Sequence, residues 1–156
     1  MHFLYNLIMV FAEFLLKLIV PFSPKMKLFV EGRQTVFTTL SRKIMAYDKS
    51  IWFHAASLGE YEQGLPVIEK MKRKYPNHKI VLTFFSPSGY EVRKNNTIAD
   101  VTVYLPLDTK KNAQKFIKMI RPDLVFFIKY EYWPNYLNEL KIQKVPTYLI
   151  SGVFRE

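Results

Sequence analysis

The apolar positions of this chain change their spacing several times between residue 51 and the C-terminus. Short runs of consecutive apolar residues, typical of strands covered on both faces, alternate with stretches that repeat apolar residues at helical spacing. The predicted strands are Ile51–His54, Lys79–Phe85, Val101–Leu105, Leu124–Ile128 and Thr147–Ile150. The predicted helices are Tyr61–Tyr75, Tyr90–Asn95, Thr109–Ile120 and Pro134–Gln143. This alternation predicts right-handed crossovers and an α/β fold with a Rossmann-like parallel sheet.

The first 24 residues have a different pattern, an apolar run from 3 to 20 that contains Asn6, Glu13 and Lys17. These three positions lie on one face of a helix because they are 7 and then 4 residues apart. A polar stripe on an apolar helix favours a helix in the membrane interface, or one packed on protein with its other face in lipid. We therefore expect residues 1–24 to form a membrane-anchor helix, and a buried helix in a soluble domain is the alternative.

Residues 25–50 are rich in basic side chains, and we expect them to form a basic linker. Between positions 25 and 43, one acidic residue, Glu31, is accompanied by Lys25, Lys27, Arg33, Arg42 and Lys43. Basic residues beside an apolar segment mark its cytoplasmic side and attract anionic headgroups. The expected location is thus the cytoplasmic face of the inner membrane, and the alternative for this segment is an ordinary solvated loop.

The seven residues HAASLGE at 54–60 connect the first predicted strand to its helix. Small residues allow a tight turn with accessible N–H groups, and Glu60 lies at the mouth of that turn. In open α/β sheets such turns line the ligand crevice. Glu60 is therefore a candidate catalytic or ligand-binding residue. Its spacing from Ser57 also fits a capping box, in which Glu60 binds the backbone N–H of Ser57.

Polar residues also follow the other predicted strands. Ser86, Ser88 and Gly89 come after the second strand, and Glu131 comes after the fourth, where it is either a partner of Lys129 or an arginine, or a substrate contact. Each loop alone fits ordinary turn chemistry. Because the carboxyl ends of parallel strands share one edge, these loops and Glu60 are expected to line one crevice.

Composition excludes several kinds of site. The chain has 156 residues, 49% of them hydrophobic, and no cysteine, so disulfides, thiolate zinc sites and cysteine nucleophiles are excluded. Three scattered histidines make a histidine metal cluster unexpected, and no glycine-rich nucleotide motif or G-x-S-x-G motif occurs. The net charge of +10 suits an anionic partner, but no nucleic-acid-binding module is present. We expect no metal, no cofactor and no nucleic acid.

Several motifs together resemble the N-terminal half of bacterial 3-deoxy-D-manno-octulosonic acid (Kdo) transferases. They are HAASLGE at 54–60 with Gly64, Pro66 and Tyr75-Pro76, TFFSPSG at 83–89, YLPLD at 104–108, EYWPN at 131–135, and Gly32-Arg33 after the apolar N-terminus. The resemblance covers nearly the whole chain with the motifs in order.

The resemblance implies a two-domain GT-B glycosyltransferase of the inner membrane that transfers Kdo from CMP-Kdo to the lipid A precursor, lipid IV(A), with inversion. Residues 51–156 would be the acceptor-binding domain, and a C-terminal donor domain would be absent, so the chain alone is expected to be inactive. The alternatives are a non-catalytic membrane-bound module that binds acidic lipid, and an acceptor domain of another GT-B enzyme.

The family motifs also imply roles for individual residues. Glu60 matches the glutamate that acts as general base. Lys129 stands where the family often has an acidic residue that stabilises the transition state, which leaves its role open. The expected substrate contacts are Ser57, Gly59, Ser86, Ser88, Gly89 and Glu131.

Overall fold

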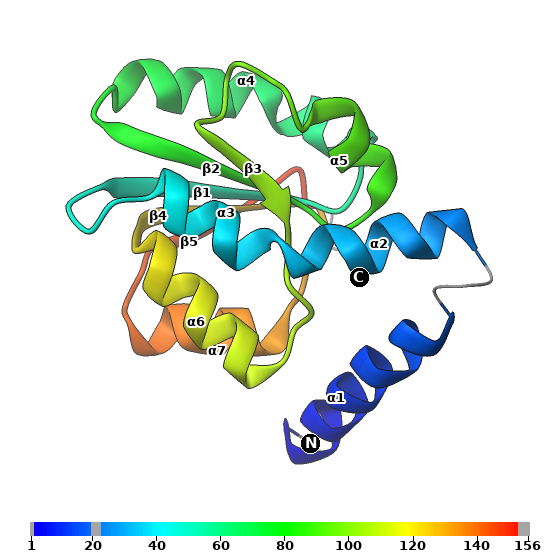
Figure 1. Ribbon diagram of the computed structural model, residues 1–156. Coiled ribbons are helices and arrows are strands. Elements are labelled where there is room, and N and C mark those ends of the chain that lie inside the picture. Colours follow the sequence, from blue (N-terminus) through cyan, green and yellow to red (C-terminus); the bar gives the residue numbers. More distant parts are fainter. Residues whose placement is uncertain (1, 20–22, 153–156) are drawn as a thin grey trace.

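One five-stranded parallel sheet in the order β3-β2-β1-β4-β5 forms the centre of the computed structural model (Figure 1), which describes residues 2–19 and 23–152. The strands are β1 (Lys49–Ala55), β2 (His78–Phe84), β3 (Val101–Tyr104), β4 (Pro122–Ile128) and β5 (Thr147–Ile150). All four pairings are parallel. The predicted parallel α/β fold is confirmed, and every predicted strand boundary lies within two residues of the observed one.

Helices cover both faces of the sheet. The helices after the first strand are α4 (Leu58–Lys74), α5 (Pro87–Arg93), α6 (Lys110–Ile120) and α7 (Pro134–Ile142). The helices α4 and α5 lie on one face, and α6 and α7 lie on the other, as Figure 1 shows. This arrangement buries both faces and explains why the strands are almost continuously apolar.

The central strand β1 contributes to two separate core layers because successive side chains point to opposite faces. Ile51 and Phe53 belong to the apolar cluster under α4. Trp52 belongs to the other cluster. Its ring centroid lies 5.1 Å from that of Phe116 and 5.5 Å from that of Tyr136. All three β1 side chains are fully buried. His54 is two residues after Trp52 and therefore lies on the α6–α7 face.

The prediction of a basic linker at 25–50 is wrong, because this segment contains α2 (Pro24–Gln34), α3 (Val36–Lys43) and the start of β1. Ser23 caps α2 by accepting a hydrogen bond from Met26 N at 3.5 Å, and Pro24 occupies the first turn. Val36 and Leu40, four residues apart, are buried in the core. The basic residues of these helices are mostly on the exposed side, so their charge concealed an amphipathic pattern.

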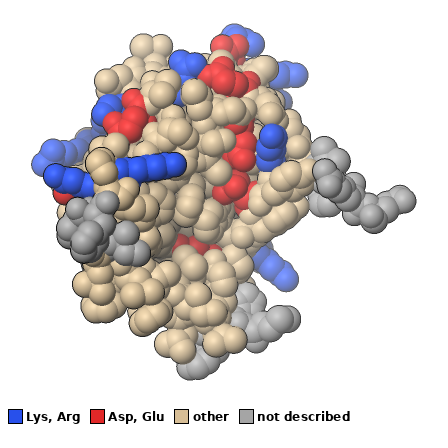
Figure 2. Space-filling model, turned by 90° about the vertical axis from the view of Figure 1, so that its right-hand side faces the viewer, with Lys and Arg blue, Asp and Glu red and all other residues tan. Residues whose placement is uncertain are grey.

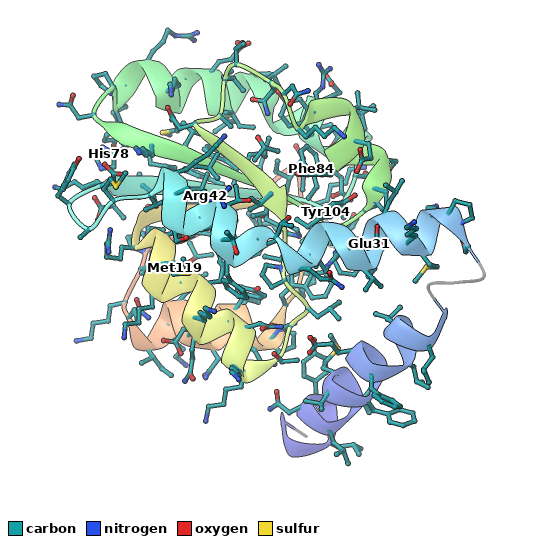
Figure 3. The ribbon with its side chains drawn as sticks, viewed as in Figure 1. Glu31, Arg42, His78, Phe84, Tyr104 and Met119 are labelled. Carbon is teal, nitrogen blue, oxygen red and sulfur yellow. The ribbon has the colours of Figure 1, made fainter. Side chains whose placement is uncertain are left out.

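A glycine lets α2 approach the edge of the sheet closely. A Cβ atom on Gly32 would lie 2.2 Å from the ring of Tyr104, the last residue of β3. Figure 3 shows Tyr104 beside α2, with His78 at the opposite, amino end of the strands. A larger residue at position 32 would force α2 away from the carboxyl edge.

The N-terminal helix α1 (His2–Ile19) presents its apolar face to solvent. Its exposed side chains include Leu4, Leu7, Ile8, Val10, Phe11, Phe14 and Leu18, each 55–61% exposed. The opposite face meets the rest of the protein, where Asn6 Oδ1 accepts a hydrogen bond from Asn135 Nδ2 at 2.9 Å. No helix within residues 2–19 and 23–152 is long and apolar enough to cross a membrane. The polar side of α1 thus faces the protein, as in the predicted alternative of a helix packed on protein. Contact of its apolar face with a membrane stays a prediction.

Asp108, at the end of the β3–α6 loop, accepts hydrogen bonds from both α1 and α7. Its carboxylate accepts the backbone N–H groups of Asn135 and Tyr136, both at 3.1 Å, and therefore caps α7 from a distant loop. The same carboxylate accepts the hydroxyl of Tyr5 in α1 at 2.7 Å. Asp108 is fully buried, and burial raises the pKa of its carboxyl group against the opposing effect of these three hydrogen bonds.

Replacing Asp108 by alanine should destabilise the fold, because two helix N–H groups and a tyrosine hydroxyl lose their acceptor inside the protein. We expect the free energy of unfolding to fall by roughly 3 kcal/mol in urea denaturation. Asp123→Ala is the control: Asp123 pairs with His78 at 3.0 Å, but its side chain is 50% exposed. That change should cost less than about 0.5 kcal/mol. Equal losses in the two variants would contradict the role of Asp108.

Candidate active site

Glu60 lies in the first turn of α4, where its carboxylate folds back onto the end of β1. The carboxylate accepts a hydrogen bond from the backbone N–H of Ala56 at 2.5 Å. The predicted capping box is therefore wrong in detail: Glu60 binds Ala56 rather than Ser57, and the Ser57 side chain makes no capping hydrogen bond. The bond holds the Glu60 carboxylate at the carboxyl edge of the central strand.

The surroundings of Glu60 raise the pKa of its carboxyl group. Burial is the largest cause, the hydrogen bond from Ala56 N–H opposes it, and the negative charge of Glu131 raises the pKa further. His54 and Lys129 act in the opposite direction. Glu60 remains partly exposed, so it is accessible to a ligand. A carboxylate with a raised pKa is a better proton acceptor than an ordinary one, as general-base catalysis requires.

Glu131 follows β4 and is held by two nitrogen atoms. Its Oε2 atom lies 3.2 Å from His54 Nε2 and 2.9 Å from Trp133 Nε1. The Glu131 side chain is 15% exposed, whereas that of His54 is fully buried. Sequence analysis left open a partner for Glu131 in Lys129 or an arginine, and the structure instead gives it His54 and Trp133. These two contacts fix the position of the Glu131 carboxylate at the carboxyl edge of the sheet.

His54 is connected in turn to the neighbouring strand. Its Nδ1 atom lies 2.8 Å from Thr83 Oγ1, and Thr83 is its register partner on β2. Thr83 Oγ1 also accepts the indole N–H of Trp52 at 2.8 Å. Sequence analysis missed His54 and Thr83 as members of the site. The available signal was the presence of a polar residue in each of two otherwise apolar strands.

Lys129 stands at the turn between β4 and Glu131. Its backbone has a positive φ of 64°, a left-handed conformation uncommon for a residue with a side chain, and its N–H donates to Ile150 O at 2.8 Å. The chain thus turns sharply directly after β4. Because β4 pairs in parallel with β1, Lys129 follows its strand at the same carboxyl edge as Glu60.

The loop after β2 is attached directly to the turn that contains Glu60. Ser86 N donates to Ala56 O at 2.8 Å, and the hydroxyls of Ser86 and Ser88 lie 2.7 Å apart. A Cβ atom on Gly89 would lie 2.3 Å from the ring of Phe84 and 3.1 Å from the backbone nitrogen of Leu58, so glycine allows α5 to pack there. Gly59, by contrast, is exposed and has no neighbour within 4 Å of a built Cβ atom.

All the predicted site residues therefore lie at the carboxyl edge of the sheet, as expected from parallel topology. Figure 2 views this edge and shows acidic side chains near its middle with basic side chains around them. Within residues 2–19 and 23–152, no group of three or more His, Cys, Asp or Glu side chains is arranged to hold a metal ion. The catalytic and substrate-binding roles of the individual residues stay predictions.

Arg33 of α2 is a further residue of this edge. It was predicted as part of the basic segment and of the Gly32-Arg33 motif, but not as a site residue. Its guanidinium group donates to the carbonyl oxygens of Phe85 at 2.7 Å and Leu105 at 2.9 Å, and it lies 3.6 Å from the ring centroid of Phe29. Burial lowers its pKa to about 9. Arg33 thereby connects α2 to the ends of β2 and β3, including the loop that begins at Ser86.

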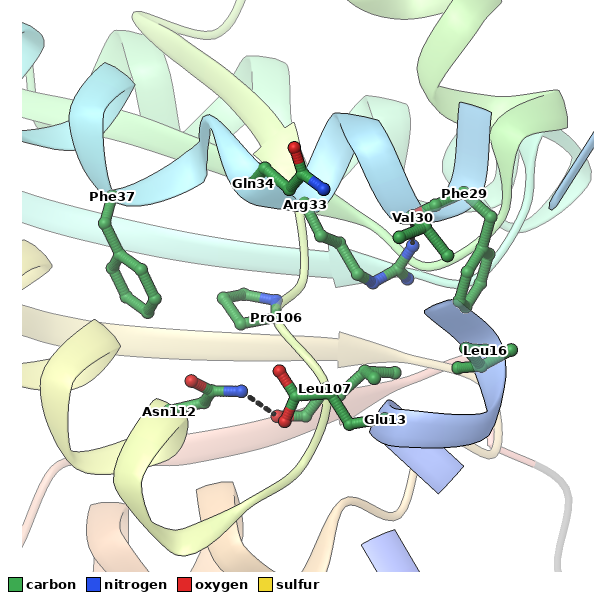
Figure 4. A pocket seen from close by; sticks show the side chains of 10 residues that line it. All are labelled: Glu13, Leu16, Phe29, Val30, Arg33, Gln34, Phe37, Pro106, Leu107 and Asn112. Carbon is green, nitrogen blue, oxygen red and sulfur yellow. Dashed lines mark hydrogen bonds between the residues drawn. The ribbon is translucent and has the colours of Figure 1, made fainter. Parts of the chain in front are cut away.

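A cavity of about 150 Å³ lies between α1, α2 and the β3–α6 loop (Figure 4). Its lining residues are Glu13, Leu16, Phe29, Val30, Arg33, Gln34, Phe37, Pro106, Leu107 and Asn112. In Figure 4 the Arg33 side chain extends toward Leu107, and Glu13 of α1 enters from below. Since Arg33 also binds the Phe85 carbonyl, one side chain joins this cavity to the loop beside Glu60.

Comparisons with known proteins identify a family that this chain matches. Residues 29–156 match a sequence model of the family described as 3-deoxy-D-manno-octulosonic-acid transferase (kdotransferase). The chain is 34% identical over 100 residues to 3-deoxy-D-manno-octulosonic acid transferase of Haemophilus influenzae, a match that covers 63% of this chain and 23% of that protein. It is 32% identical over 97 residues to the protein of the same name from Aquifex aeolicus, covering 62% of this chain and 27% of that protein.

A third relative, the 3-deoxy-D-manno-octulosonic acid transferase of Chlamydia trachomatis, is 30% identical over 108 residues, which are 68% of this chain and 25% of that protein. The matched segment thus spans about a quarter of the length of these relatives. The relatives are named as transferases, and such enzymes act between a sugar donor and an acceptor. The chain belongs to the Kdo transferase family of glycosyltransferases and corresponds to their N-terminal domain.

Proposed function

We propose that this chain is the acceptor-binding half of an enzyme that transfers Kdo from CMP-Kdo to the lipid A precursor, lipid IV(A), with Glu60 as the general base. The observation that carries the proposal is the position of Glu60. Its carboxylate is fixed at the end of the central strand by Ala56 N–H, remains partly exposed, and has a raised pKa. These are the properties required of a group that takes a proton from an attacking hydroxyl.

In this proposal the acceptor hydroxyl attacks the anomeric carbon of Kdo and inverts it. The hydroxyl oxygen forms the new bond, its proton passes to Glu60, and CMP leaves with the electrons of the broken bond. The second domain of a GT-B enzyme would bring CMP-Kdo to this edge. Lys129 follows β4 at the same carboxyl edge as Glu60. We propose that its ammonium group stabilises negative charge on the donor or the acceptor.

The acceptor would lie along the loops that meet beside Glu60. We assign the contacts with its phosphorylated disaccharide to Ser57 and Gly59 of the first turn and to Ser86, Ser88 and Gly89 of the next loop. The support is the backbone hydrogen bond between Ser86 and Ala56, which joins these two segments into one surface. The net charge of +10 favours approach of such an anionic acceptor.

We further propose that α1 rests in the cytoplasmic face of the inner membrane. The support is the inverted polarity of this helix: its apolar face is exposed, whereas Tyr5 and Asn6 bind the protein. A face of this kind is stable in the interface of a bilayer and costly in water. In the lower part of Figure 2, where α1 lies, the visible surface is almost free of acidic and basic side chains.

Glu60→Gln should nearly abolish Kdo transfer in a protein that joins this chain to the remaining domain of a family member. Loss of a general base lowers the rate by about 10²–10⁴-fold. Glutamine keeps an oxygen that can accept the Ala56 N–H, so we expect little change in the urea midpoint. The measurement is the rate of transfer from CMP-Kdo to lipid IV(A), with the urea midpoint of the variant as evidence that the fold is intact.

Glu60→Ala is the matched comparison, because it removes both the base and the hydrogen bond to Ala56. It should show the same loss of transfer and also a lower stability. Near-normal transfer by Glu60→Gln, with a defect in Glu60→Ala alone, would show that Glu60 is only a structural acceptor and would contradict the proposed mechanism.

Phe11→Glu should release the protein from membranes, since Phe11 is 60% exposed in the middle of the apolar face of α1. Placing a carboxylate there opposes burial of that face in lipid and adds repulsion from anionic headgroups. We expect at least a 10-fold loss of binding to phosphatidylethanolamine–phosphatidylglycerol vesicles in a sedimentation assay, which is about 1.4 kcal/mol.

Val92→Glu is the control for this experiment, because Val92 is 59% exposed on α5 and therefore receives the same charge elsewhere. It should leave vesicle binding close to that of the unchanged chain. If Phe11→Glu also binds normally, α1 is not the membrane contact.

A further inference from the structure

The side chain of Arg33 joins α2 to the ends of two neighbouring strands. Its Nη2 atom donates to Phe85 O at 2.7 Å, and its Nε atom donates to Leu105 O at 2.9 Å. Phe85 and Leu105 are the first residues after β2 and β3. The last residues of these strands, Phe84 and Tyr104, are register partners. One guanidinium group therefore holds the two carbonyl oxygens that come directly after the parallel ladder.

These contacts depend on the planar fork of a guanidinium group. The third nitrogen of Arg33, Nη1, donates to Phe29 O in the same helix at 2.8 Å, so each nitrogen atom has an acceptor. The Cζ atom lies 3.6 Å from the ring centroid of Phe29 and 4.8 Å from that of Phe85. Lysine has one nitrogen atom and no plane to stack on a ring, so it could not reproduce this set of contacts.

The carbonyl group of Phe85 is part of the peptide unit that begins the loop of residues 86–89. The nitrogen atom of the same unit, Ser86 N, donates to Ala56 O at 2.8 Å. Because the C=O and N–H groups of a trans peptide point in opposite directions, Arg33 and the turn at Ala56 hold this unit from two sides. Ser86 is also the N-cap residue of α5, so the same peptide unit determines where α5 begins.

The ring of Phe85 extends the connection to the loop after β4. It meets the ring of Phe29 edge-on at 5.3 Å between centroids, and its centroid lies 4.8 Å from that of Trp133. Trp133 Nε1 donates to Glu131 Oε2 at 2.9 Å. Phe85 thus links α2 with both loops that carry expected substrate contacts: its carbonyl group leads to Ser86, and its ring leads to Trp133 and Glu131.

We infer that Arg33 is a positioning residue, which holds the Phe85–Ser86 peptide unit in place and with it the loop of residues 86–89. Through the ring of Phe85 it also orients Trp133, the donor to Glu131. The part of this inference that concerns the acceptor rests on the proposed function. In that function the acceptor contacts the two loops, and Arg33 acts on the acceptor through them.

Arg33→Lys keeps the positive charge and removes the fork, and amide hydrogen exchange in the full 156-residue chain, followed by NMR, measures the result. Without its donor the peptide unit is freer to rotate, which exposes Ser86 N–H. We expect Ser86 N–H to exchange at least about 10-fold faster relative to the backbone N–H of Trp52, as for loss of one hydrogen bond from a charged donor. Trp52 is fully buried in the central strand and serves as the internal reference.

Arg42→Lys is the matched control, because Arg42 is exposed on α3 and undergoes the same substitution away from the strand ends. It should leave the ratio of the two exchange rates unchanged. If Arg33 contributed only to global stability, Arg33→Lys would accelerate exchange at Trp52 at least as much as at Ser86. A ratio that does not rise would therefore overturn the inference.

Phe85→Leu separates the two connections, because it removes the ring but keeps the carbonyl group that Arg33 binds. The indole N–H of Trp133 should exchange faster in this variant, whereas Ser86 N–H should keep the rate of the unchanged chain. Arg33→Lys should accelerate both. An indole N–H that exchanges at its original rate in Phe85→Leu would overturn the link from Arg33 to Glu131.

The guanidinium signals of Arg33 in the unchanged chain need no substitution. Since three carbonyl oxygens hold this group, rotation of its Nη groups should be slow enough to give separate N–H signals. A single averaged Nη signal would overturn the inference even if Arg33→Lys does not fold.

Binding of a soluble, phosphorylated analogue of the lipid A precursor connects the inference to function. Arg33→Lys should raise the dissociation constant about 10-fold, which is about 1.4 kcal/mol, and Arg42→Lys should not change it. Equal affinity in Arg33→Lys and the unchanged chain would overturn the role of Arg33 in acceptor binding. If the unchanged chain does not bind the analogue, the proposed function fails, whereas the exchange ratios still decide whether Arg33 positions the loop.

Discussion

Parallel pairing of β1 with both β2 and β4 is the constraint on which the rest of this structure depends. It places the ends of three strands side by side, so that Ala56, Ser86 and Lys129 lie on one edge although they are distant in sequence. The hydrogen bonds from Ser86 N to Ala56 O and from Ala56 N to Glu60 then join two of these loops. A site composed of short loops gains its precision from the rigid strands that carry them.

The two faces of the central strand β1 differ in polarity: one is apolar, and the other carries hydrogen-bonded polar groups. Ile51 and Phe53 point toward α4 and supply ordinary apolar packing. On the other face, Trp52 and His54 combine packing with the polar chain that reaches Glu131. The carboxyl edge is thus supported from within the core, and substitutions of these buried polar residues should displace the Glu131 side chain as well as lower stability.

Much of this organisation was predictable from sequence, because strands and helices follow from local periodicity and the shared edge follows from β-α alternation. The predicted positions of Glu60, Glu131 and the Ser86 loop were therefore correct. The helices at 24–43 were missed because basic residues obscured the apolar spacing of Val36 and Leu40. The long-range hydrogen bonds of His54, Asp108 and Arg33 were not predictable, since they join residues between 27 and 103 positions apart.

The central claim is that the acceptor binds at the carboxyl edge beside Glu60. Amide chemical-shift mapping with a soluble, phosphorylated analogue of the lipid A precursor tests it most directly. The account predicts that the largest perturbations occur at Ser57, Glu60 and Ser86, with no change at His78 or Asp123 on the opposite edge. Perturbations confined to His78, Asp123 and their neighbours would contradict it.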